Sequence, residues 1–452
     1  MAFFGIAGGG ITGLTLALNL QRKGHRVLVW EQSDQAGGAI RSHREGGWLA
    51  ESGPNSIQDS DESVSQVVEA VGLSDRMLEA STQAKRRYIV RGSRPVRVPE
   101  SALDAVRTPL FSWGAKLGVA AEPFRSRPED TPEDESLASF VRRRLGQEFL
   151  DYTINPMVGG IYAGNPEKLS VGHAFPKVKA LEDEFGSLIR GAVGRMRERR
   201  KSGRKAYKKR VLSFPDGLGE LTGALAGRLG TSLQLNTGVL SVNRTAEGGY
   251  SIETRTGKTC VVDRFIYAGT AHGLEKIHFS GFTGDPAGIA SKITYAPVHS
   301  VTLGFSREQV EHPVDGFGVL VPEVEPIRIL GCLFPSSIFP GRSPENGVTL
   351  TVFIGGMRRP ELTKLDDDDL MRVIRGDLRT LLGVTGDPAF TRIHRWAKAI
   401  PQYEVGYGDI LSYMDEIERG NPGFEYAGNY KTGISLDACI RYGWSYNPDD
   451  QL

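Results

Sequence analysis

Cysteine is scarce in this chain of 452 residues, and the usual metal-binding patterns are missing. The three cysteines, Cys260, Cys332 and Cys439, are far apart and form no CxxC or Cys/His spacing. They therefore argue against a disulfide framework or a zinc site, and they favour a reducing compartment. The eight histidines include no HxH or HExxH pair, so we expect no metal site.

Long apolar runs are also missing. No uninterrupted stretch reaches the roughly 18 residues that suggest a transmembrane helix, and glycines break up the opening MAFFGIAGGGITGL, unlike a secretory signal. We expect a cytoplasmic protein, and a peripheral contact with the cytoplasmic face of the membrane stays open. The 55 Lys+Arg against 54 Asp+Glu give a net charge of +1, which argues against a nucleic-acid-binding protein.

Glycine, by contrast, is abundant. The 56 glycines are about 12% of the chain, against a usual share of roughly 7%, so we expect many turns and loops whose backbone contacts a ligand. The length and the 39% hydrophobic content allow two or three domains with cores of their own.

The amino terminus has the pattern of a dinucleotide-binding unit. Phe3 to Ala7 reads as a buried parallel strand, a GxGxxG motif follows, and a helix is predicted from Ile11 to Arg22. A second strand from His25 to Trp30 ends at an acidic residue placed to bind the adenosine ribose. The expected nucleotide contacts are Gly8, Gly9, Gly10, Ile11, Thr12, Gly13, Glu31 and Gln32.

A second glycine pair distinguishes FAD from NAD. Gly37-Gly38 is followed by Arg41, which is placed to meet a phosphate, and by EGGWLAESGPNSIQ. This arrangement resembles the flavin amine oxidase and protoporphyrinogen oxidase superfamily, in which FAD is bound in an extended form; NAD enzymes lack this pair. The expected contacts here are Gly38, Arg41, Gly53, Pro54, Asn55 and Ser56.

Two later segments complete the expected FAD site. Near the carboxy terminus, a helix from about Ser435 would point its positive end at a reduced flavin. Ser213 to Gly230 is predicted as a turn and a helix, Leu233 to Val242 as a strand, and Phe265 to Ala271 as the last strand of that segment. The resemblance places the Val239 backbone at the adenine. The other expected contacts are Asn429, Gly433, Ile434 and Ser435.

The middle of the chain closely resembles the protoporphyrinogen oxidases, and the resemblance covers essentially the whole chain. Asn155 to Gly191, GFGVLVP, the LF-x-SS-x-x-FP-x-R pattern of Leu333 to Arg342 and the ending YAGNYKTGIS carry the resemblance. Amine oxidases usually have Gly-Glu where this chain has Gly428-Asn429, and carotenoid desaturases lack the block from Gly160 to Gly164.

The resemblance implies an oxygen-dependent reaction of heme biosynthesis. Protoporphyrinogen IX loses six electrons as hydride to non-covalent FAD, and dioxygen is reduced to hydrogen peroxide. No catalytic side chain is required, because the flavin accepts the hydride. Oxidation of coproporphyrinogen III to coproporphyrin III, an FAD amine oxidase and a non-enzymatic FAD-binding protein remain alternatives.

The resemblance also implies a substrate slot. Arg87 matches an arginine that faces a substrate propionate, and Leu320 and Phe334 match residues that pack on the macrocycle. The backbone at Gly160 is expected to line the same slot, since glycine admits a ligand where a side chain would not. Without the resemblance, Arg87 would be one more solvated cation, and the two apolar residues would be core.

We expect an α/β (α+β) fold with a discontinuous Rossmann-like FAD domain, a mixed-sheet substrate domain and a mostly helical insertion. The FAD domain would comprise residues 1–80, 211–285 and 395–452, the substrate domain 81–94 and 286–394, and the insertion 95–210. An acid-capped helix is predicted in DDDDLMRVIRGDLRTLLG.

The insertion ends in a basic stretch, residues 190–210, with eleven basic residues against one glutamate. Its net charge of +10 leaves −9 for the rest of the chain, since the total is +1. A solvated loop, a contact with anionic lipid headgroups and steering of an anionic porphyrinogen are the three interpretations. The sequence does not define the oligomeric state, and a homodimer is one possibility. It does not define the sensitivity to inhibitors either. After Gly443 only nine residues remain, so the final helix is expected to be short.

Overall fold

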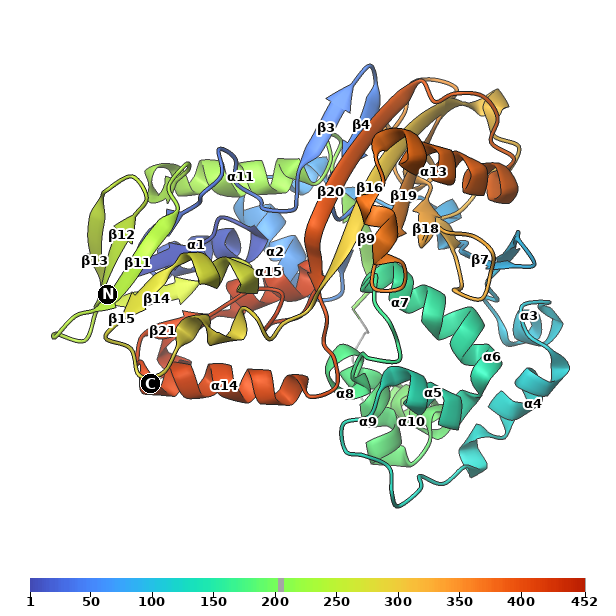
Figure 1. Ribbon diagram of the computed structural model, residues 1–452, viewed down its shortest axis with the longest axis horizontal. Helices are drawn as coiled ribbons and strands as arrows, with labels where there is room; N and C mark the ends of the chain where they lie inside the picture. The colour runs from blue at the N-terminus through green and yellow to red at the C-terminus, as the bar shows by residue number, and fades with distance from the viewer. Residues whose placement is uncertain (202–206, 452) are drawn as a thin grey trace.

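The computed structural model describes residues 1–201 and 207–451, and Figure 1 shows their arrangement. One parallel five-stranded sheet is assembled from remote parts of the chain, in the order β10-β2-β1-β14-β21. Because all five strands run the same way, their carboxyl ends meet at one edge of the sheet. The strands are β1 (Phe3–Ala7), β2 (Arg26–Trp30), β10 (Leu233–Gln234), β14 (Arg264–Tyr267) and β21 (Phe424–Tyr426).

Helices pack around this sheet with a shared apolar core. Leu14 of α1, Leu221 of α11 and Ile440 of α15 are all buried in one cluster with Phe4 and Val29 of the sheet. The predicted first strand and helix are confirmed, and the final helix spans ten residues. The helices of this core are α1 (Ile11–Arg22), α2 (Glu62–Ala70), α11 (Gly219–Leu229) and α15 (Leu436–Ser445). Another helix, α14 (Tyr407–Gly420), packs in a second cluster with Phe265 and Phe424 of the same sheet.

The strand predicted from Leu233 to Val242 is wrong as a single element. It divides into β10, in the parallel sheet, and β11 (Val239–Arg244), in a separate four-stranded sheet with β12 (Tyr250–Thr254), β13 (Thr259–Val262) and β15 (His278–Ser280). Asn236 adopts a positive φ of 52°, and the N–H of Thr237 donates to the carbonyl of Glu31, so the chain turns there. The prediction that 265–271 holds the last strand of its segment is also wrong, because β15 follows it.

A mixed seven-stranded sheet forms the upper right of Figure 1, in the order β20-β16-β19-β18-β17-β7-β8. The predicted acid-capped helix is confirmed as α13 (Asp367–Leu382) with Asp366 as its N-cap, and it covers one face, where Val319, Cys332 and Val352 are buried. The strands are β7 (Tyr88–Arg91), β8 (Arg94–Arg97), β16 (Tyr295–Ser306), β17 (Gly318–Leu320), β18 (Gly331–Leu333), β19 (Gly347–Gly355) and β20 (Phe390–Pro401).

The opposite face of this sheet meets segments of the chain that are expected to belong to the FAD domain. Successive residues of a strand point to opposite faces, so Leu320 and Leu333 lie on the face away from α13. The hairpin β3 (Ser42–Glu45) and β4 (Trp48–Glu51) covers one end of that face, where Trp48 stacks on Phe390. A side chain at Gly304 would collide with the Trp48 ring, so the glycine allows this close packing.

The insertion is helical and lies at the lower right of Figure 1. A short π-helix, Leu150–Ile154, runs into α7 (Asn155–Ile161), and buried Arg144 pairs with buried Glu182. None of the helices within the described ranges is long and apolar enough to span a membrane. The other helices are α3 (Ala102–Arg107), α4 (Trp113–Ala120), α5 (Leu137–Leu145), α6 (Gln147–Phe149), α8 (Val171–Ala174), α9 (Pro176–Phe185) and α10 (Leu188–Lys201).

Two of the expected domain boundaries fall inside strands. β8 continues in the seven-stranded sheet to Arg97, and β20 continues in it to Pro401. We propose the same three domains with boundaries after these residues. A small three-stranded sheet, in which β9 (Arg210–Ser213) pairs with β5 (Ile57–Asp59) and β6 (Leu78–Glu79), joins the end of the insertion to the part of the chain expected to bind FAD.

Candidate active site

The amino-terminal glycines stand at the carboxyl edge of the parallel sheet. A side chain at Gly13 would overlap the carbonyl oxygen of Gly8, and a Cβ at Gly8 (φ +114°) would lie 2.7 Å from the backbone of Ala268. At Gly10, by contrast, a Cβ would meet no described atom within 4 Å. Two glycines are therefore needed for packing, while Gly10 leaves open space beside Ile11 at the start of α1, which fits a cofactor pyrophosphate.

The acidic residue after β2 is held by backbone. The Glu31 carboxylate accepts hydrogen bonds from the N–H of Gly9 at 2.7 Å and of Ser33 at 2.8 Å. Its neighbour Gln32 is exposed, and a Cβ at Gly238 would lie 3.3 Å from the Gln32 Cβ. The structure thus brings Val239, which follows Gly238, beside the acidic end of β2. The Thr12 side chain is buried, so it is covered by protein atoms. Contact of Thr12 with the nucleotide stays a prediction.

The second glycine pair packs against the first motif. The N–H of Gly37 donates to the carbonyl of Gly9 at 2.8 Å, and Gly38 lies against the Cα of Gly10. The Nε of Arg41 is buried and has no hydrogen-bond partner within residues 1–201 and 207–451. A buried guanidinium nitrogen without a partner fits an anionic group such as a phosphate.

The GPNS segment after β4 lies alongside this loop. A Cβ at Gly53 would lie 2.8 Å from the carbonyl oxygen of Ala39, and Asn55 donates to the carbonyl of Gly53 at 3.0 Å. Pro54 and Ser56 are partly exposed beside them. The indole N–H of Trp396 in β20 donates to the carbonyl of Ser52 at 2.8 Å, so this segment joins the FAD side to the seven-stranded sheet.

The carboxy-terminal motif completes the edge. Gly428 (φ +131°) packs near the carbonyl of Gly269, and Gly433 has φ +110°. The N-cap of α15 is Ser435, whose side chain makes no cap bond to described backbone, so the first amides of α15 remain available to a ligand. Asn429 and Ile434 are partly exposed in the same loop. The residues at this edge fit an extended FAD, whose individual contacts stay predictions.

The expected substrate residues are only partly brought together. A Cβ at Gly160 would lie 2.7 Å from Leu320 Cδ2, and the adjacent Ile161 is 45% exposed. Arg87 is exposed directly before β7, with its guanidinium carbon 5.4 Å from the centroid of the Phe317 ring. Because the Leu320 strand β17 pairs with β7, which Arg87 precedes, the three residues lie in neighbouring strands and the adjoining helix, and an apolar slot with a cation at one end stays a prediction.

Phe334 does not line this slot. Its side chain is 0% exposed and packs in the core cluster under α13, with Val319 and Cys332. A fully buried ring cannot pack on a ligand, so we do not carry its expected role forward.

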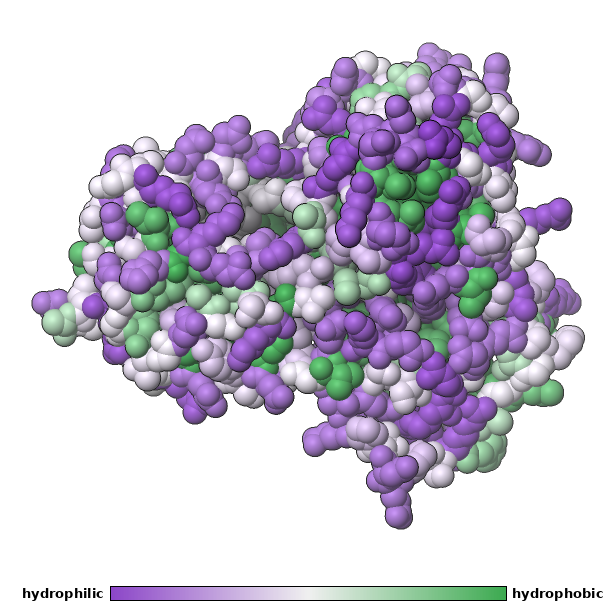
Figure 2. Space-filling view, viewed as in Figure 1, coloured by the Kyte–Doolittle hydropathy of each residue, from purple (hydrophilic) through white to green (hydrophobic). Residues whose placement is uncertain are grey.

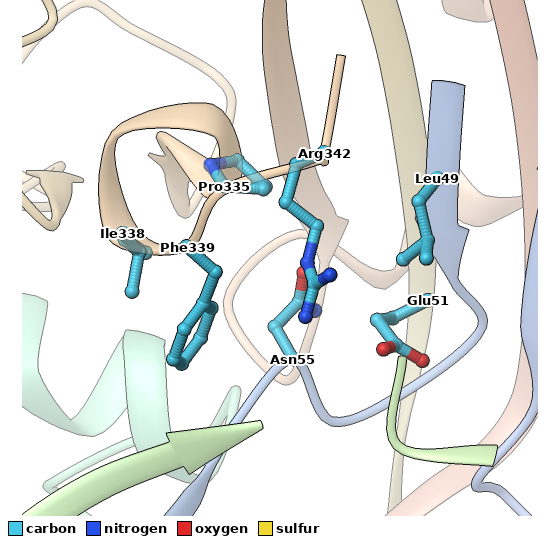
Figure 3. A pocket seen from close by; sticks show the side chains of 7 residues that line it. All are labelled: Leu49, Glu51, Asn55, Pro335, Ile338, Phe339 and Arg342. Carbon is cyan, nitrogen blue, oxygen red and sulfur yellow. The ribbon is translucent and has the colours of Figure 1, made fainter. Parts of the chain in front are cut away.

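A small pocket separates the GPNS segment from α12 (Pro335–Ile338) (Figure 3). Phe339 and Asn55 line it, together with two buried charged residues, Glu51 and Arg342. Sequence reasoning singled out Asn55 but not Glu51, Phe339 or Arg342, although Phe339 and Arg342 belong to the LF-x-SS-x-x-FP-x-R pattern. Phe339 packs in one cluster with Ala84, and Phe317, the ring beneath Arg87, packs against that cluster, so this pocket lies beside the proposed slot.

Arg342 and Glu51 hold the turn before α11. The Arg342 guanidinium donates to Ser213 Oγ and to the carbonyls of Phe214 and Pro215. Glu51 accepts from the N–H of Leu218 at 2.8 Å and from the Ser42 hydroxyl at 2.6 Å. Burial raises the pKa of Glu51 to about 7, and the bonds from Ser42 and Leu218 oppose that rise only in part.

This raised pKa predicts a pH dependence of stability. Between pH about 4.5 and pH about 7, the folded chain keeps a proton on Glu51 that the unfolded chain has released. The contribution of Glu51 to the free energy of unfolding therefore falls as the pH rises from about 4.5 to about 7, and it is constant above pH about 7. The loss is about 3 kcal/mol. Glu51→Gln, which mimics the protonated carboxyl, is expected to remove it. Urea unfolding of the parent protein and of Glu51→Gln at pH 5 and pH 8 measures this loss. If the free energy of unfolding of the two proteins differs by the same amount at both pH values, the raised pKa of Glu51 is contradicted.

Comparison with known proteins agrees with this architecture. Residues 11–445 match the family described as flavin containing amine oxidoreductase. The chain is 32% identical to protoporphyrinogen oxidase 2 of Arabidopsis thaliana, over 97% of this chain and 91% of that protein. It is 29% identical to coproporphyrinogen III oxidase of Staphylococcus aureus, over 97% of this chain and 96% of the relative.

A solved structure has the same fold. The protein from Exiguobacterium sp. 255-15, provisionally named a protoporphyrinogen oxidase, superposes with a TM-score of 0.81 at 26% identity, over 98% of this chain and 97% of the other. The chain therefore belongs to the flavin-containing amine oxidoreductases and is an FAD-dependent oxidoreductase.

Proposed function

We propose that this enzyme oxidises protoporphyrinogen IX to protoporphyrin IX with dioxygen as the final acceptor. The observations that support the proposal are the packing of the apolar Leu320 side chain on the Gly160 backbone and the exposed cation Arg87 directly before β7, the strand that pairs with the Leu320 strand. A flat tetrapyrrole with carboxylates on one side matches an apolar slot with a terminal cation. The names of the Arabidopsis and Staphylococcus relatives support a porphyrinogen substrate.

The protein's part in this reaction is positioning. Bound FAD supplies the two-electron chemistry, accepting hydride and passing its electrons to dioxygen. The slot holds the ring in place and excludes water, and Arg87 fixes the carboxylate end. No described side chain has to form a covalent bond to the substrate.

Coproporphyrinogen III is the second candidate substrate, because a second guanidinium lies close to the slot. Arg358 Nη2 would be 2.8 Å from a Cβ at Gly159, and its Nη1 donates to Asn155 Oδ1 at 2.5 Å. Burial lowers the pKa of Arg358 to about 10, so it stays charged at neutral pH. Two extra propionates would need such an additional cation.

Porphyrin fluorescence separates these substrates. We expect kcat/KM for protoporphyrinogen IX to exceed that for coproporphyrinogen III by at least about tenfold, which corresponds to about 1.4 kcal/mol. The reverse ratio would make coproporphyrinogen III the substrate. Turnover of amines without porphyrin formation would indicate an amine oxidase, and a yellow protein that turns over neither substrate would indicate an FAD-binding protein.

We further propose that the helical insertion contacts an anionic membrane surface. Trp113 and Leu117 of α4 are 67% and 69% exposed, and Phe124 is 86% exposed. Figure 2 shows hydrophobic side chains along the edge of the molecule that carries α4. Exposed aromatic and aliphatic side chains next to basic residues suit a lipid interface. The basic stretch contributes α10, while its residues 202–206 lie outside the described residues.

Replacement of Trp113 and Leu117 by serine is expected to reduce co-sedimentation with phosphatidylserine vesicles by at least about tenfold, because both side chains leave water in the bound state. Val261→Ser is the matched control, since Val261 is 60% exposed on β13, which lies outside the helical insertion. Equal binding by the double variant and the control would rule out insertion by α4. Binding unaffected by neutralising the arginines of α10 would remove the basic stretch from the proposal.

A further inference from the structure

Two neighbouring tyrosines, whose rings are tilted against each other, hold the loop that contains Asn429 through hydrogen bonds to its carbonyls. The Tyr403 hydroxyl donates to the carbonyl of Asn429, and the Tyr407 hydroxyl donates to the carbonyl of Tyr430 at 2.6 Å. The two phenol rings are 4.6 Å apart between centroids, and both side chains are buried. Two consecutive peptide groups of the flavin-facing loop are thus fixed by two side chains that are themselves packed against each other.

Residues 402 and 403 also contact the end of α7, the helix that carries Gly160. Gln402 is buried, and its Nε2 donates to the carbonyl of Tyr162 at 2.9 Å. The Tyr162 ring packs against the Tyr403 ring, with 6.0 Å between centroids. Tyr162 directly follows α7, so neighbouring residues 402 and 403 connect the slot helix to the loop at the FAD edge.

The direction of these hydrogen bonds has a consequence for the loop. In a trans peptide the carbonyl and the N–H point in opposite directions, so the Asn429 carbonyl bound to Tyr403 turns the N–H of Tyr430 away from Tyr403. A hydrogen bond to a carbonyl also polarises its peptide and strengthens the N–H as a donor. In the next peptide, whose carbonyl Tyr407 binds, the N–H of Lys431 donates to the carbonyl of Gly428, so the Tyr407 bond holds the turn that follows the Tyr430 N–H. Burial raises the pKa of Tyr403 and Tyr407 far above the usual value, so both phenols remain protonated donors.

We propose that Tyr403 and Tyr407 are positioning residues that orient the peptide between Asn429 and Tyr430 toward FAD, Tyr403 directly and Tyr407 by holding the turn that follows, and that with Gln402 they tie this loop to α7. The inference rests on FAD as the cofactor and not on the identity of the substrate. It assigns a role to Tyr403, between β20 and α14, and to Tyr407, the first residue of α14, neither of which the proposed reaction itself uses.

The test replaces each phenol by phenylalanine in the FAD-loaded protein. Tyr403→Phe and Tyr407→Phe are each expected to raise the Kd for FAD about 5- to 10-fold, as the loss of one hydrogen bond of about 1 kcal/mol predicts. The flavin midpoint potential is expected to become more negative in Tyr403→Phe, because a weaker Tyr430 N–H donor stabilises the reduced flavin less. Tyr407→Phe is expected to shift the potential in the same direction by a smaller amount, because the turn that holds this N–H is loosened. The visible flavin absorbance should shift as well.

Tyr250→Phe is the matched control. Tyr250 is fully buried and its hydroxyl donates to the carbonyls of Asn421 and Pro422, away from the flavin loop. This variant is expected to lose stability while keeping the FAD affinity, midpoint potential and spectrum of the parent protein.

Two results decide the inference. If Tyr403→Phe and Tyr407→Phe match Tyr250→Phe in FAD affinity and potential, the tyrosines only stabilise the fold and the inference is overturned. If Tyr403→Phe does not fold, Tyr407→Phe alone decides between the same outcomes. Neither readout uses a porphyrinogen, so failure of the proposed substrate would leave this test unaffected.

Discussion

A Gly13→Val protein is expected to be purified without its yellow cofactor. A Cβ at Gly13 would overlap the carbonyl oxygen of Gly8, which is backbone and cannot rotate away. Relief of that overlap has to move the first turn of α1 away from β1, and the move would destroy the pyrophosphate cradle. Overpacking of this kind costs roughly 1–3 kcal/mol of stability as well. The flavin-to-protein absorbance ratio measures the loss of FAD.

Two other glycines serve as controls for this result. Gly227→Ala on the exposed side of α11 should keep the FAD content and gain up to about 1 kcal/mol of stability, because glycine is a poor helix former. Gly10→Ala should fold normally but bind FAD more weakly, since its Cβ meets open space in the protein and only a ligand would clash. A Gly13→Val protein with full FAD content would show that the cofactor does not lie at this turn.

Arg87→Ala is expected to raise KM for the porphyrinogen about 10- to 100-fold, while FAD content stays unchanged. This range corresponds to the loss of one charge-assisted hydrogen bond, about 1.5–3 kcal/mol. The side chain is exposed beside Phe317 and so has little structural role to lose. Steady-state kinetics by porphyrin fluorescence gives KM and kcat separately.

Arg94→Ala is the matched control, because Arg94 is exposed at the far end of the same β7–β8 hairpin. It should leave KM unchanged. An equal rise in both variants would indicate a general electrostatic attraction of the substrate and not a contact at Arg87. Loss of FAD from Arg87→Ala would move this residue out of the slot.

Local patterns predicted the FAD edge well, because its signals lie within short segments. The strand, GxGxxG turn and helix at residues 3–22 follow from hydrophobic periodicity and glycine spacing, and the structure matches their bounds. The division of residues 233–242 was not predicted, since it depends on a positive φ at Asn236 and on a backbone bond to Glu31.

The slot depended more on three-dimensional context. Leu320 and Phe334 looked alike in the sequence, but strand alternation places Leu320 on the open face, while Phe334 packs under α13. Glu51 lies in a segment that the sequence analysis identified, yet its pKa depends on burial against remote residues such as Leu218, 167 positions away, and Arg342. Gln402 and Tyr403 bond to the carbonyls of Tyr162 and Asn429, so the contact joins three segments that are remote in the sequence. Such a contact leaves no local sequence pattern.

The central claim is that a porphyrinogen reduces the FAD of this enzyme, and anaerobic mixing tests it most directly. Purified FAD-loaded protein is mixed without oxygen with protoporphyrinogen IX, and the flavin absorbance near its visible maximum is followed. The account predicts that the absorbance bleaches and that it returns when oxygen is admitted, with hydrogen peroxide formed. Flavin that stays oxidised with both protoporphyrinogen IX and coproporphyrinogen III would contradict the proposed function.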